Sequence, residues 1–470
     1  MLRKKREVPY LCCPFGERMS VATANKDLQV ELTYKQILKI VLPISFAILI
    51  PQVNYIINSI FLGHYSQQVL AIAGITGVYY LIFSAIGGGL NNGLQALIAR
   101  RAGENRIDEI GKLFNQGIIT GLFIAIFGIV FTWTSTPFIF KLFIKDPGRL
   151  QQAIEFSKIR IWGLVFLYIY QLRNALLVGT NQSRYLVIGA LAETVANVLF
   201  DYVLIFGKWG FPAMGLNGAA VASIIAEFVG MLVIFLVIRQ KGIGKRFRLF
   251  KNISWDKHNA ALIFSMSAPL IFQYAISVAS WEYFFLLIDK QGETALAISN
   301  TMRNIFGLFG IVTWAFASTT NMMVSNIIGQ QRKDQVWKLL GKLIRLVGGF
   351  ALLFTILLNL FPHLFLDIFG QNEAFIQQAI PVVRVVSVAM LMMSISVVFL
   401  NAVIGTGNSR VSLAIEIGTV SLYCAYIYFV LGKLTLSITY GWMAEWVYWI
   451  GMFIPSYFYM RSGKWKKTVI

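Results

Sequence analysis

The fold of this chain is decided by residues 259–288, NAALIFSMSAPLIFQYAISVASWEYFFLLI. This stretch exceeds the ~20 apolar residues that a helix needs to cross a bilayer. Its single charged side chain is Glu282, which lies between Trp281 and Tyr283. Because a lone carboxylate inside a membrane span is energetically costly, such a residue marks a functional site by default.

The composition of the whole chain is that of a polytopic membrane protein. Of 470 residues, 57% are hydrophobic and 13% are charged, and the mean hydropathy is +0.67. Soluble domains carry about 25% charged residues. The net charge of +20 lies in short segments between apolar runs, so we expect a lipid bilayer and no nucleic acid as partner. The three cysteines show neither disulfide nor metal-site spacing.

Twelve apolar runs are long enough to form membrane helices, the structure that satisfies backbone polar groups in lipid. They are residues 37–62, 69–97, 112–135, 153–179, 185–207, 217–238, 259–288, 293–320, 344–366, 376–404, 411–431 and 441–460. With the N-terminus inside, 29 of the 41 Lys and Arg residues lie in inner segments and 6 in outer loops. This asymmetry predicts that both termini are cytoplasmic. Residues 1–36 lack a signal-peptide core, and Met19 is a second candidate start.

An internal repeat relates the two halves at a constant offset of 226 residues. The offset carries Pro43 onto Pro269 and Gly103 onto Gly329, and it carries the GT-x-x-SR turn at 179–184 onto that at 405–410. We therefore predict an all-α protein with two parallel six-helix repeats around a central cavity. The expected domains are an N-terminal segment (1–36), an N-lobe (37–238), a linker (239–258), a C-lobe (259–460) and a tail (461–470).

Polar residues that differ between the repeats predict the sites. Asp201 and Asn197 on the fifth helix correspond to Ile427 and Tyr423, and Glu282 corresponds to Ile56. One helical turn separates Asn54 from Asn58, and likewise Asn197 from Asp201, so each pair shares a face. The predicted cation-coupling residues are Asn54, Tyr55, Asn58, Asn174, Glu193, Asn197, Asp201 and Glu282. The coupling ion is H⁺ or Na⁺, with sodium placed at Asp201 and Asn197. The alternative is that Asp201 and Glu193 merely pair with Arg160 or Arg173.

A second set of residues, in the C-lobe, is predicted to contact substrate. It comprises Glu282, Trp281, Tyr283, Phe284, Asn300, Arg303 and Met393. Aromatic rings beside an acid are typical of surfaces that bind organic cations. The alternative for Glu282 is an ion pair with Arg303. Glu227, Glu416 and Glu445 also lie in apolar runs, and the sequence assigns them no partner.

The chain contains no metalloprotease motif, nucleophile elbow, phosphate-binding loop or dinucleotide fingerprint, so we expect no enzyme and no cofactor. The glycine-rich GGGLNNG, residues 87–93, lies within an apolar run and indicates close helix contact or a kink.

The order of several motifs resembles the multidrug and toxic compound extrusion (MATE) family. These motifs are PQVNYIINSIFLG on the first helix, LIARRAGE after the second, ANVLFDYVLIFG on the fifth, and SWEYFFLLIDKQGETALAIS across the seventh and eighth. The resemblance implies cation-coupled antiport of amphipathic, often cationic compounds. It places Asn197 and Asp201 in the first-lobe cation site and Glu282 in the second-lobe site. Two positions depart from the family: Asn58 stands where many relatives have an aspartate, and Met393 stands near their helix-10 aspartate.

We predict a monomeric antiporter of a bacterial inner membrane that exports small amphipathic or cationic compounds in exchange for protons or sodium. One alternative is a flippase for a lipid-linked or other amphipathic envelope precursor. A channel or membrane receptor is a further alternative, and flux against an imposed gradient distinguishes it from an antiporter.

Overall fold

The computed structural model describes residues 26–251, 253–369 and 372–468, and all the regular secondary structure within them is helical. Residues 1–25, including the second candidate start Met19, lie outside the described residues. Eleven helices in the described chain are long and apolar enough to cross a membrane. The helix α17 (Ala444–Ser462) completes the twelve that the sequence predicts, and the all-α membrane fold is confirmed.

The twelve helices fall into two groups of six. The first group is α2 (Tyr34–Tyr65), α3 (Gln67–Gly103), α4 (Ile107–Lys141), α5 with α6 (Pro147–Arg160 and Leu164–Gly179), α7 (Leu186–Phe206) and α8 (Gly215–Gln240). The second group is α10 (Lys257–Asp289), α11 (Glu293–Gly329), α12 (Val336–Leu360), α14 (Glu373–Gly405), α15 (Ser409–Ile427) and α17. Short helices connect them: α9 (Ile243–Arg246), α13 (Pro362–Leu366), the π-helix η6 (Tyr428–Lys433) and α16 (Ile438–Trp442).

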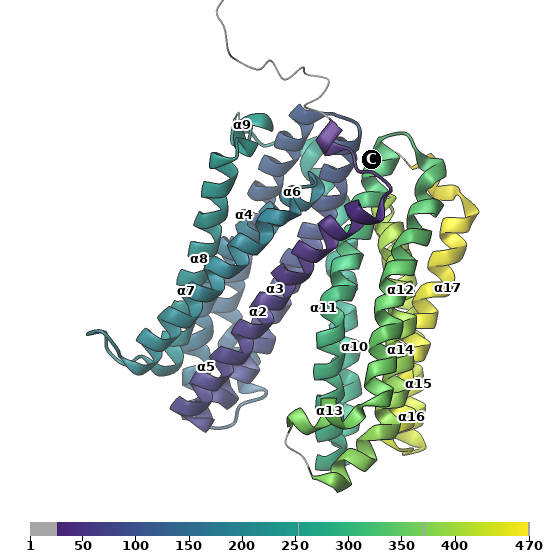
Figure 1. Cartoon of the computed structure of the whole chain (residues 1–470). Helices are drawn as coiled ribbons and strands as arrows, with labels where there is room; N and C mark the ends of the chain where they lie inside the picture. Colours follow the sequence, from purple (N-terminus) through teal and green to yellow (C-terminus); the bar gives the residue numbers. More distant parts are fainter. Residues whose placement is uncertain (1–25, 252, 370–371, 469–470) are drawn as a thin grey trace, which may run out of the picture.

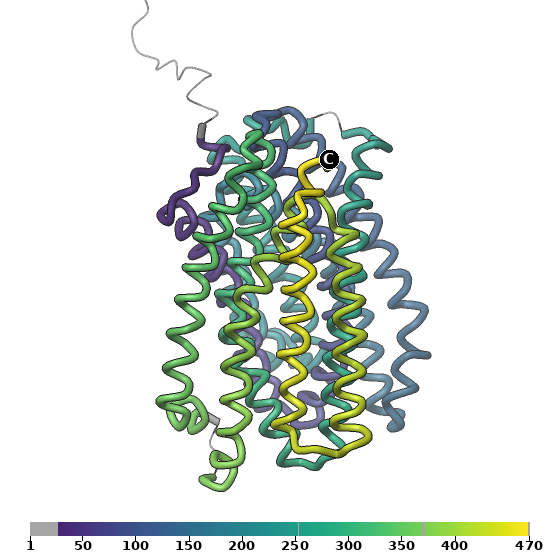
Figure 2. The backbone as a smooth tube through the Cα atoms, turned by 90° about the vertical axis from the view of Figure 1, so that its right-hand side faces the viewer, coloured from purple at the N-terminus to yellow at the C-terminus, as the bar shows by residue number. Residues whose placement is uncertain are grey.

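The two groups form two lobes that lie side by side (Figure 1). Their helix bounds repeat at the sequence offset, because α3 and α11 both begin and end 226 residues apart. The same offset relates the start of α5 and the end of α6 to the bounds of α14. The last described residues lie at the same end of the molecule as residues 27–33, which precede α2 (Figure 2). The duplication read from the sequence is therefore a duplication of structure.

Several predicted apolar runs are divided in the structure, as 153–179 is between α5 and α6. The run 344–366 divides at Phe361 (φ −128°, ψ 54°), because a residue before proline is disfavoured in helical conformation and Pro362 starts a new short helix. The run 441–460 likewise divides into α16 and α17 at Met443. Hydropathy continues through both points, so composition alone does not report these breaks.

Capping residues fix where several helices start. Thr33 accepts a hydrogen bond from the backbone N–H of Gln36, and Asp256 accepts from those of His258 and Asn259. These bonds satisfy N–H groups that have no partner within the helix. The backbone N–H of Asn259 also holds the pKa of the Asp256 carboxyl below its ordinary value. The entry points of α2 and α10, one for each lobe, are thus set by their own sequence.

The lobes touch over several helix pairs, and we call one of these contacts the closed seam: residues 89–103 of α3 against 267–274 of α10 and 318–329 of α11. A methyl group on Gly89 would lie 2.7 Å from Ile271 Cγ1, and one on Gly93 would lie 2.3 Å from Ser267 Oγ. The glycine-rich 87–93 segment is therefore a close helix contact, as the sequence indicates. In the described chain, the hydrogen bonds between α3 and α11 all lie within residues 92–100 and 318–326.

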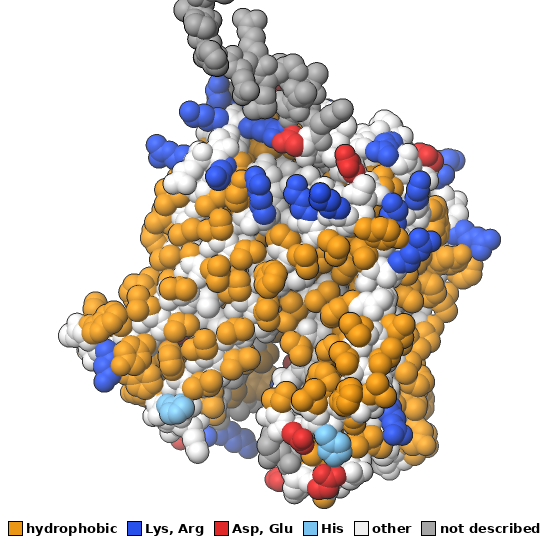
Figure 3. Space-filling model, in the orientation of Figure 1, with side chains coloured by type: hydrophobic (Ala, Val, Ile, Leu, Met, Phe, Trp, Pro, Cys, Tyr) orange, Lys and Arg blue, Asp and Glu red, His pale blue; other side chains and the backbone are white. Residues whose placement is uncertain are grey.

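Beyond the closed seam, the lobes separate. Figure 3 shows a hollow between them at one end of the molecule, and most of the basic side chains visible on this face gather at the opposite end. Some side chains on the halves of α2 and α11 away from the seam are exposed, among them Ile56 and Leu308. The fold is thus closed at the basic end and open at the other.

Candidate functional site

Two hydrogen-bonded pairs join α2 to α7 inside the N-lobe. Asn58 Nδ2 donates to Asp201 Oδ2 at 3.0 Å, and Asn54 Nδ2 donates to Asn197 Oδ1 at 2.7 Å. Asp201 is 0% exposed and Asn197 is buried, whereas Asn54 and Asn58 are half-buried. Because the polar residues are one turn apart on both helices, the two hydrogen-bonded pairs form one above the other.

Several buried atoms of this site have no hydrogen-bond partner in the described chain. They include the acceptor oxygens Asp201 Oδ1 and Asn54 Oδ1. An unpaired carboxylate oxygen beside amide oxygens suits a proton or a hard cation such as sodium, both of which seek oxygen. The oxygen atoms of these residues are therefore suited to binding a transported coupling cation. The described chain holds no group of three His, Cys, Asp or Glu side chains that would suit a tightly held metal.

The arginines of the N-lobe are engaged elsewhere. Arg160 forms a salt bridge of 2.5 Å with Glu227, and its guanidinium lies 3.8 Å from the centre of the Tyr80 ring. Arg173 donates to the backbone carbonyls of Ile169 and Met231. In the described chain, neither arginine forms a salt bridge with Asp201. The alternative that Asp201 only neutralises an arginine is therefore not observed.

The other predicted N-lobe residues lie apart from the two pairs. Tyr55 is 69% exposed. Glu193 is half-buried and lies against α8, because a methyl group on Gly230 would be 2.9 Å from Glu193 Cβ. Asn174 is half-buried, and its Oδ1 atom has no partner in the described chain. The structure thus brings together four of the predicted N-lobe residues: Asn54, Asn58, Asn197 and Asp201.

Glu282 is exposed and lies on the face of α10 that is directed toward the N-lobe. On that face, Ile271 touches Gly89 and the Tyr274 hydroxyl contacts Asn92 Nδ2 at 2.6 Å. Steps of four residues lead from Tyr274 through Val278 to Glu282, so Glu282 continues this face into the region where the lobes part. Arg303 on α11 is also exposed, and it stacks over the Phe285 ring at 5.1 Å. In the described chain, Glu282 and Arg303 form no ion pair.

Several residues predicted to contact substrate instead point into the C-lobe. Phe284 and Met393 are buried in its hydrophobic core. Trp281 is half-buried, and its indole N–H donates to Glu445 Oε1 at 3.3 Å. Tyr283 and Asn300 are half-buried. Consecutive residues on a helix differ in direction by about 100°, so Glu282 and its sequence neighbours cannot all face one cavity.

The structure also supplies partners for the acids that the sequence left alone. Glu416 on α15 accepts hydrogen bonds from Gln273, Ser277 and Tyr448. Glu445 on α17 accepts from the indoles of Trp281 and Trp449. One signal in the sequence could have found the first cluster: Gln273 and Ser277 on α10, and Ser412 and Glu416 on α15, are polar pairs spaced one turn apart in apolar helices.

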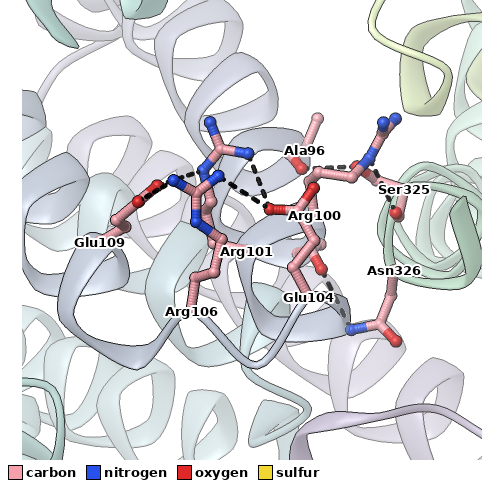
Figure 4. A network of polar contacts seen from close by, with 9 residues as sticks. Ala96, Arg100, Arg101, Glu104, Arg106, Glu109, Ser325 and Asn326 are labelled. Carbon is pink, nitrogen blue, oxygen red and sulfur yellow. Dashed lines mark hydrogen bonds and ion pairs between the residues drawn. The ribbon is translucent and has the colours of Figure 1, made fainter. Parts of the chain in front are cut away.

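Polar contacts join the two lobes across the closed seam (Figure 4). Arg100 Nε donates to the Ser325 carbonyl at 3.1 Å, and Ser325 Oγ donates to the Ala96 carbonyl at 2.6 Å. On the side of α3 away from the seam, Arg101 forms salt bridges with Glu104 (2.9 Å) and Glu109 (2.8 Å). The seam therefore pairs side chains with backbone carbonyls of the opposite lobe, a geometry that requires the helices to touch.

A segment before α2 also fastens the two lobes together. We call residues 27–33 the N-terminal strap, and its Leu28 and Val30 side chains are buried. Asn326 of the C-lobe donates to the Leu28 carbonyl at 2.9 Å and accepts from the Val30 N–H at 3.0 Å. On the N-lobe side, Gln29 donates to the Gly103 carbonyl, and Asp27 forms a salt bridge of 2.7 Å with Arg246.

A family model named MatE matches residues 43–203 and 269–429. The chain belongs to the MatE family. The two matched segments begin 226 residues apart, which is the offset of the internal repeat. The resemblance stated from the helix motifs is thereby confirmed.

Curated relatives and solved structures agree with this assignment. A probable multidrug resistance protein NorM from Thermotoga maritima is 24% identical over 458 residues, covering 93% of this chain and 94% of the relative. One from Synechocystis sp. is 23% identical over 326 residues, covering 68% and 70%. A solved multidrug resistance MATE transporter in an outward-facing conformation matches with a TM-score of 0.84 at 16% identity, covering 96% of this chain and 100% of that one. At such identity the structural likeness shows the fold alone.

Proposed function

We propose that this MatE family member is a secondary active antiporter that exports amphipathic, often cationic organic compounds in exchange for protons or sodium. The observation that carries the proposal is the bridge of Asn58 to Asp201 and Asn54 to Asn197, with free carboxylate and amide oxygens between two helices. The relatives named as multidrug resistance proteins support this class of cargo.

The distribution of charge supports an orientation. The closed end carries Arg100, Arg101, Arg246 and the strap, and Lys and Arg concentrate on the cytoplasmic side of membrane proteins. The hollow then faces away from the cytoplasm, and both termini lie inside at the bacterial inner membrane. We assign the moving bodies to residues 37–238 and 259–460, with the described conformation open to the outside.

The cation site connects to the closed seam through α2 and the strap, which contacts Asn326 of α11. Asn54 and Asn58 lie on this helix, and the strap is the segment immediately before it. A cation that binds both Asp201 Oδ1 and the unpaired Asn54 Oδ1 adds a contact between α7 and α2, so binding changes how α2 is held against α7. Movement of α2 then pulls on the strap that fastens both lobes, and this gives a mechanical route from cation binding to alternating access.

The deciding experiment reconstitutes the full chain in lipid vesicles and measures uptake of a fluorescent cationic dye under a pH gradient and then under a sodium gradient. We expect one gradient to drive uptake in the wild type and Asp201→Asn to reduce it to the level of empty vesicles. Asp289→Asn, an exposed acid at the end of α10, is the matched control. Uptake that Asp201→Asn leaves unchanged would refute the cation-site assignment.

Arg303 favours a second candidate function. It is an exposed cation on a helix that borders the hollow, and its contact is an aromatic ring rather than an acid. A cation there suits the headgroup of an anionic lipid-linked precursor, as a flippase requires. The two functions differ in their response to substitution: Arg303→Gln would abolish transfer of a fluorescent anionic lipid if the chain is a flippase, whereas Glu282→Gln would impair cationic-dye export if it is a drug exporter.

A further inference from the structure

A polar cluster inside the C-lobe joins three helices around one carboxylate. Glu416 on α15 is 0% exposed. Its Oε1 atom accepts from Ser277 Oγ at 2.5 Å and from the Tyr448 hydroxyl at 2.7 Å, and its Oε2 atom accepts from Gln273 Nε2 at 3.1 Å. Ser412 Oγ holds the other end of the Gln273 amide at 2.7 Å.

The hydrogens of this cluster can be arranged for either protonation state of Glu416. In the ionised state, Ser277, Tyr448 and Gln273 all donate to the carboxylate. Ser277 Oγ also lies 3.0 Å from the Gln273 backbone carbonyl. In the protonated state, Glu416 Oε1–H donates to Ser277 Oγ, and the serine turns its own hydrogen to that carbonyl. A hydroxyl both donates and accepts, so no heavy atom needs to move.

Two other buried glutamates of the lobes have fewer partners that can both donate and accept. Glu227 is held by the guanidinium of Arg160 at 2.5 Å, which fixes it as an anion. Glu445 accepts from two indole N–H groups, which can only donate, and interacts with one hydroxyl, that of Tyr423. Glu416 has two hydroxyl partners, and no Lys or Arg side chain in the described chain forms an ion pair with it. The groups that face it are neutral donors, so its charge is uncompensated when it is ionised.

The cluster lies at the level where the lobes part. Gln273 and Ser277 flank Tyr274 in the sequence, and Tyr274 contacts Asn92 of the N-lobe at 2.6 Å. The same turns of α10 therefore carry both the partners of Glu416 and a contact across the closed seam. Ser277 is half-buried, so the cluster is not fully sealed in the lobe core.

We propose that Glu416 is a second proton-binding site of the transport cycle, located between α10, α15 and α17 of the C-lobe. A proton from water in the hollow adds to Oε1 and later returns to water, and no other bond forms or breaks. The titratable groups that surround Glu416 are Tyr274 on α10 and Tyr448 on α17, with Glu445 beyond Tyr448. The inference rests on the proposed antiport and adds a C-lobe proton to its stoichiometry.

The test is infrared difference spectroscopy of the full chain in lipid vesicles, switched between acidic and alkaline buffer. The variant Asp201→Asn serves as background, which removes the N-lobe acid from the spectrum. We expect the Asp201→Asn variant to retain a C=O band of a protonated carboxyl group. The double variant Asp201→Asn with Glu416→Gln should lose this band. Glu416→Asp should shift the band, and Ser412→Ala, which alters the cluster but keeps the acid, should retain it.

Transport gives a second measurement. We expect Glu416→Gln alone to reduce uptake of the cationic dye driven by a pH gradient about tenfold, a usual size for the coupling between two sites. A band unchanged by both Glu416→Gln and Glu416→Asp would overturn the proposal, as would full gradient-driven uptake in Glu416→Gln. If no gradient drives uptake in the wild type, the proposed antiport fails, and the infrared result still decides whether Glu416 binds a proton.

Discussion

Gly103 and Gly329, which occupy the same position in the two repeats, lie against each other at the closed seam. A methyl group on Gly329 would lie 3.2 Å from the Cα atom of Gly103 and 2.3 Å from the carbonyl oxygen of Arg100. A methyl group on Gly103 would lie 2.1 Å from the carbonyl oxygen of Asn326. Arg100 and Asn326 also correspond at the 226-residue offset, so the local symmetry axis of the duplication passes through this contact.

Gly329→Ala should therefore open the closed seam. The added methyl group meets backbone atoms that cannot turn aside, and we expect the closed conformation to lose about 1–3 kcal/mol. The measurement is the reactivity of a cysteine introduced at the buried Ala96 toward a membrane-impermeant thiol reagent, with the natural cysteines replaced. Gly348→Ala, where nothing lies within 4 Å of the added methyl group, is the control and should leave the reactivity low.

The strap should contribute to the same closure. Leu28 is fully buried, and replacing such a side chain by alanine costs about 2–5 kcal/mol. Because the strap binds both lobes, we expect Leu28→Ala to raise the reactivity of the Ala96 cysteine without changing the cation-site bridge. Leu38→Ala, on the exposed face of α2, provides a matched leucine substitution. Equal reactivity of the Ala96 cysteine in Leu28→Ala and Leu38→Ala would contradict the role of the strap in holding the lobes together.

The salt bridge of the strap should make a small, pH-dependent contribution. Hydrogen bonds from Arg246 hold the pKa of Asp27 below its ordinary value. A lowered native pKa means that the stabilisation is present above the ordinary pKa and is lost as the pH falls through the native value. The Asp27 side chain is 60% exposed, so we expect Asp27→Asn to cost at most about 1 kcal/mol at neutral pH. Thermal unfolding should show this difference disappearing in acid.

The Arg160–Glu227 pair should matter far more for folding. Both side chains are largely buried, and removing one member leaves the other charge unpaired, which costs about 3–5 kcal/mol. We expect Arg160→Met to lower the thermal stability in detergent strongly and Arg160→Met with Glu227→Met to recover much of the loss. A double variant as unstable as the sum of the single ones would show that the two groups act independently.

The sequence predicted the N-lobe site better than the C-lobe site, for a physical reason. Asn54, Asn58, Asn197 and Asp201 are polar residues of two mainly apolar helices, and each pair shares a face, so their meeting required only that α2 and α7 be neighbours. In the C-lobe, Glu282 was grouped with Trp281 and Phe284 by sequence proximity. Helical geometry turns those rings into the lobe core while Glu282 stays exposed.

The sequence by itself determined the helical membrane fold, the duplication and its offset, because hydropathy and repetition are properties of the chain read locally. It also predicted a candidate cation site on the fifth helix. Only the tertiary structure decided which side chains are partners: Arg160 with Glu227, Glu416 with Ser277 and Tyr448, and Gly103 with Gly329. These contacts depend on which faces of distant helices pack together. Moving one residue along a helix rotates the side-chain direction by about 100°, so neighbouring residues contact different partners.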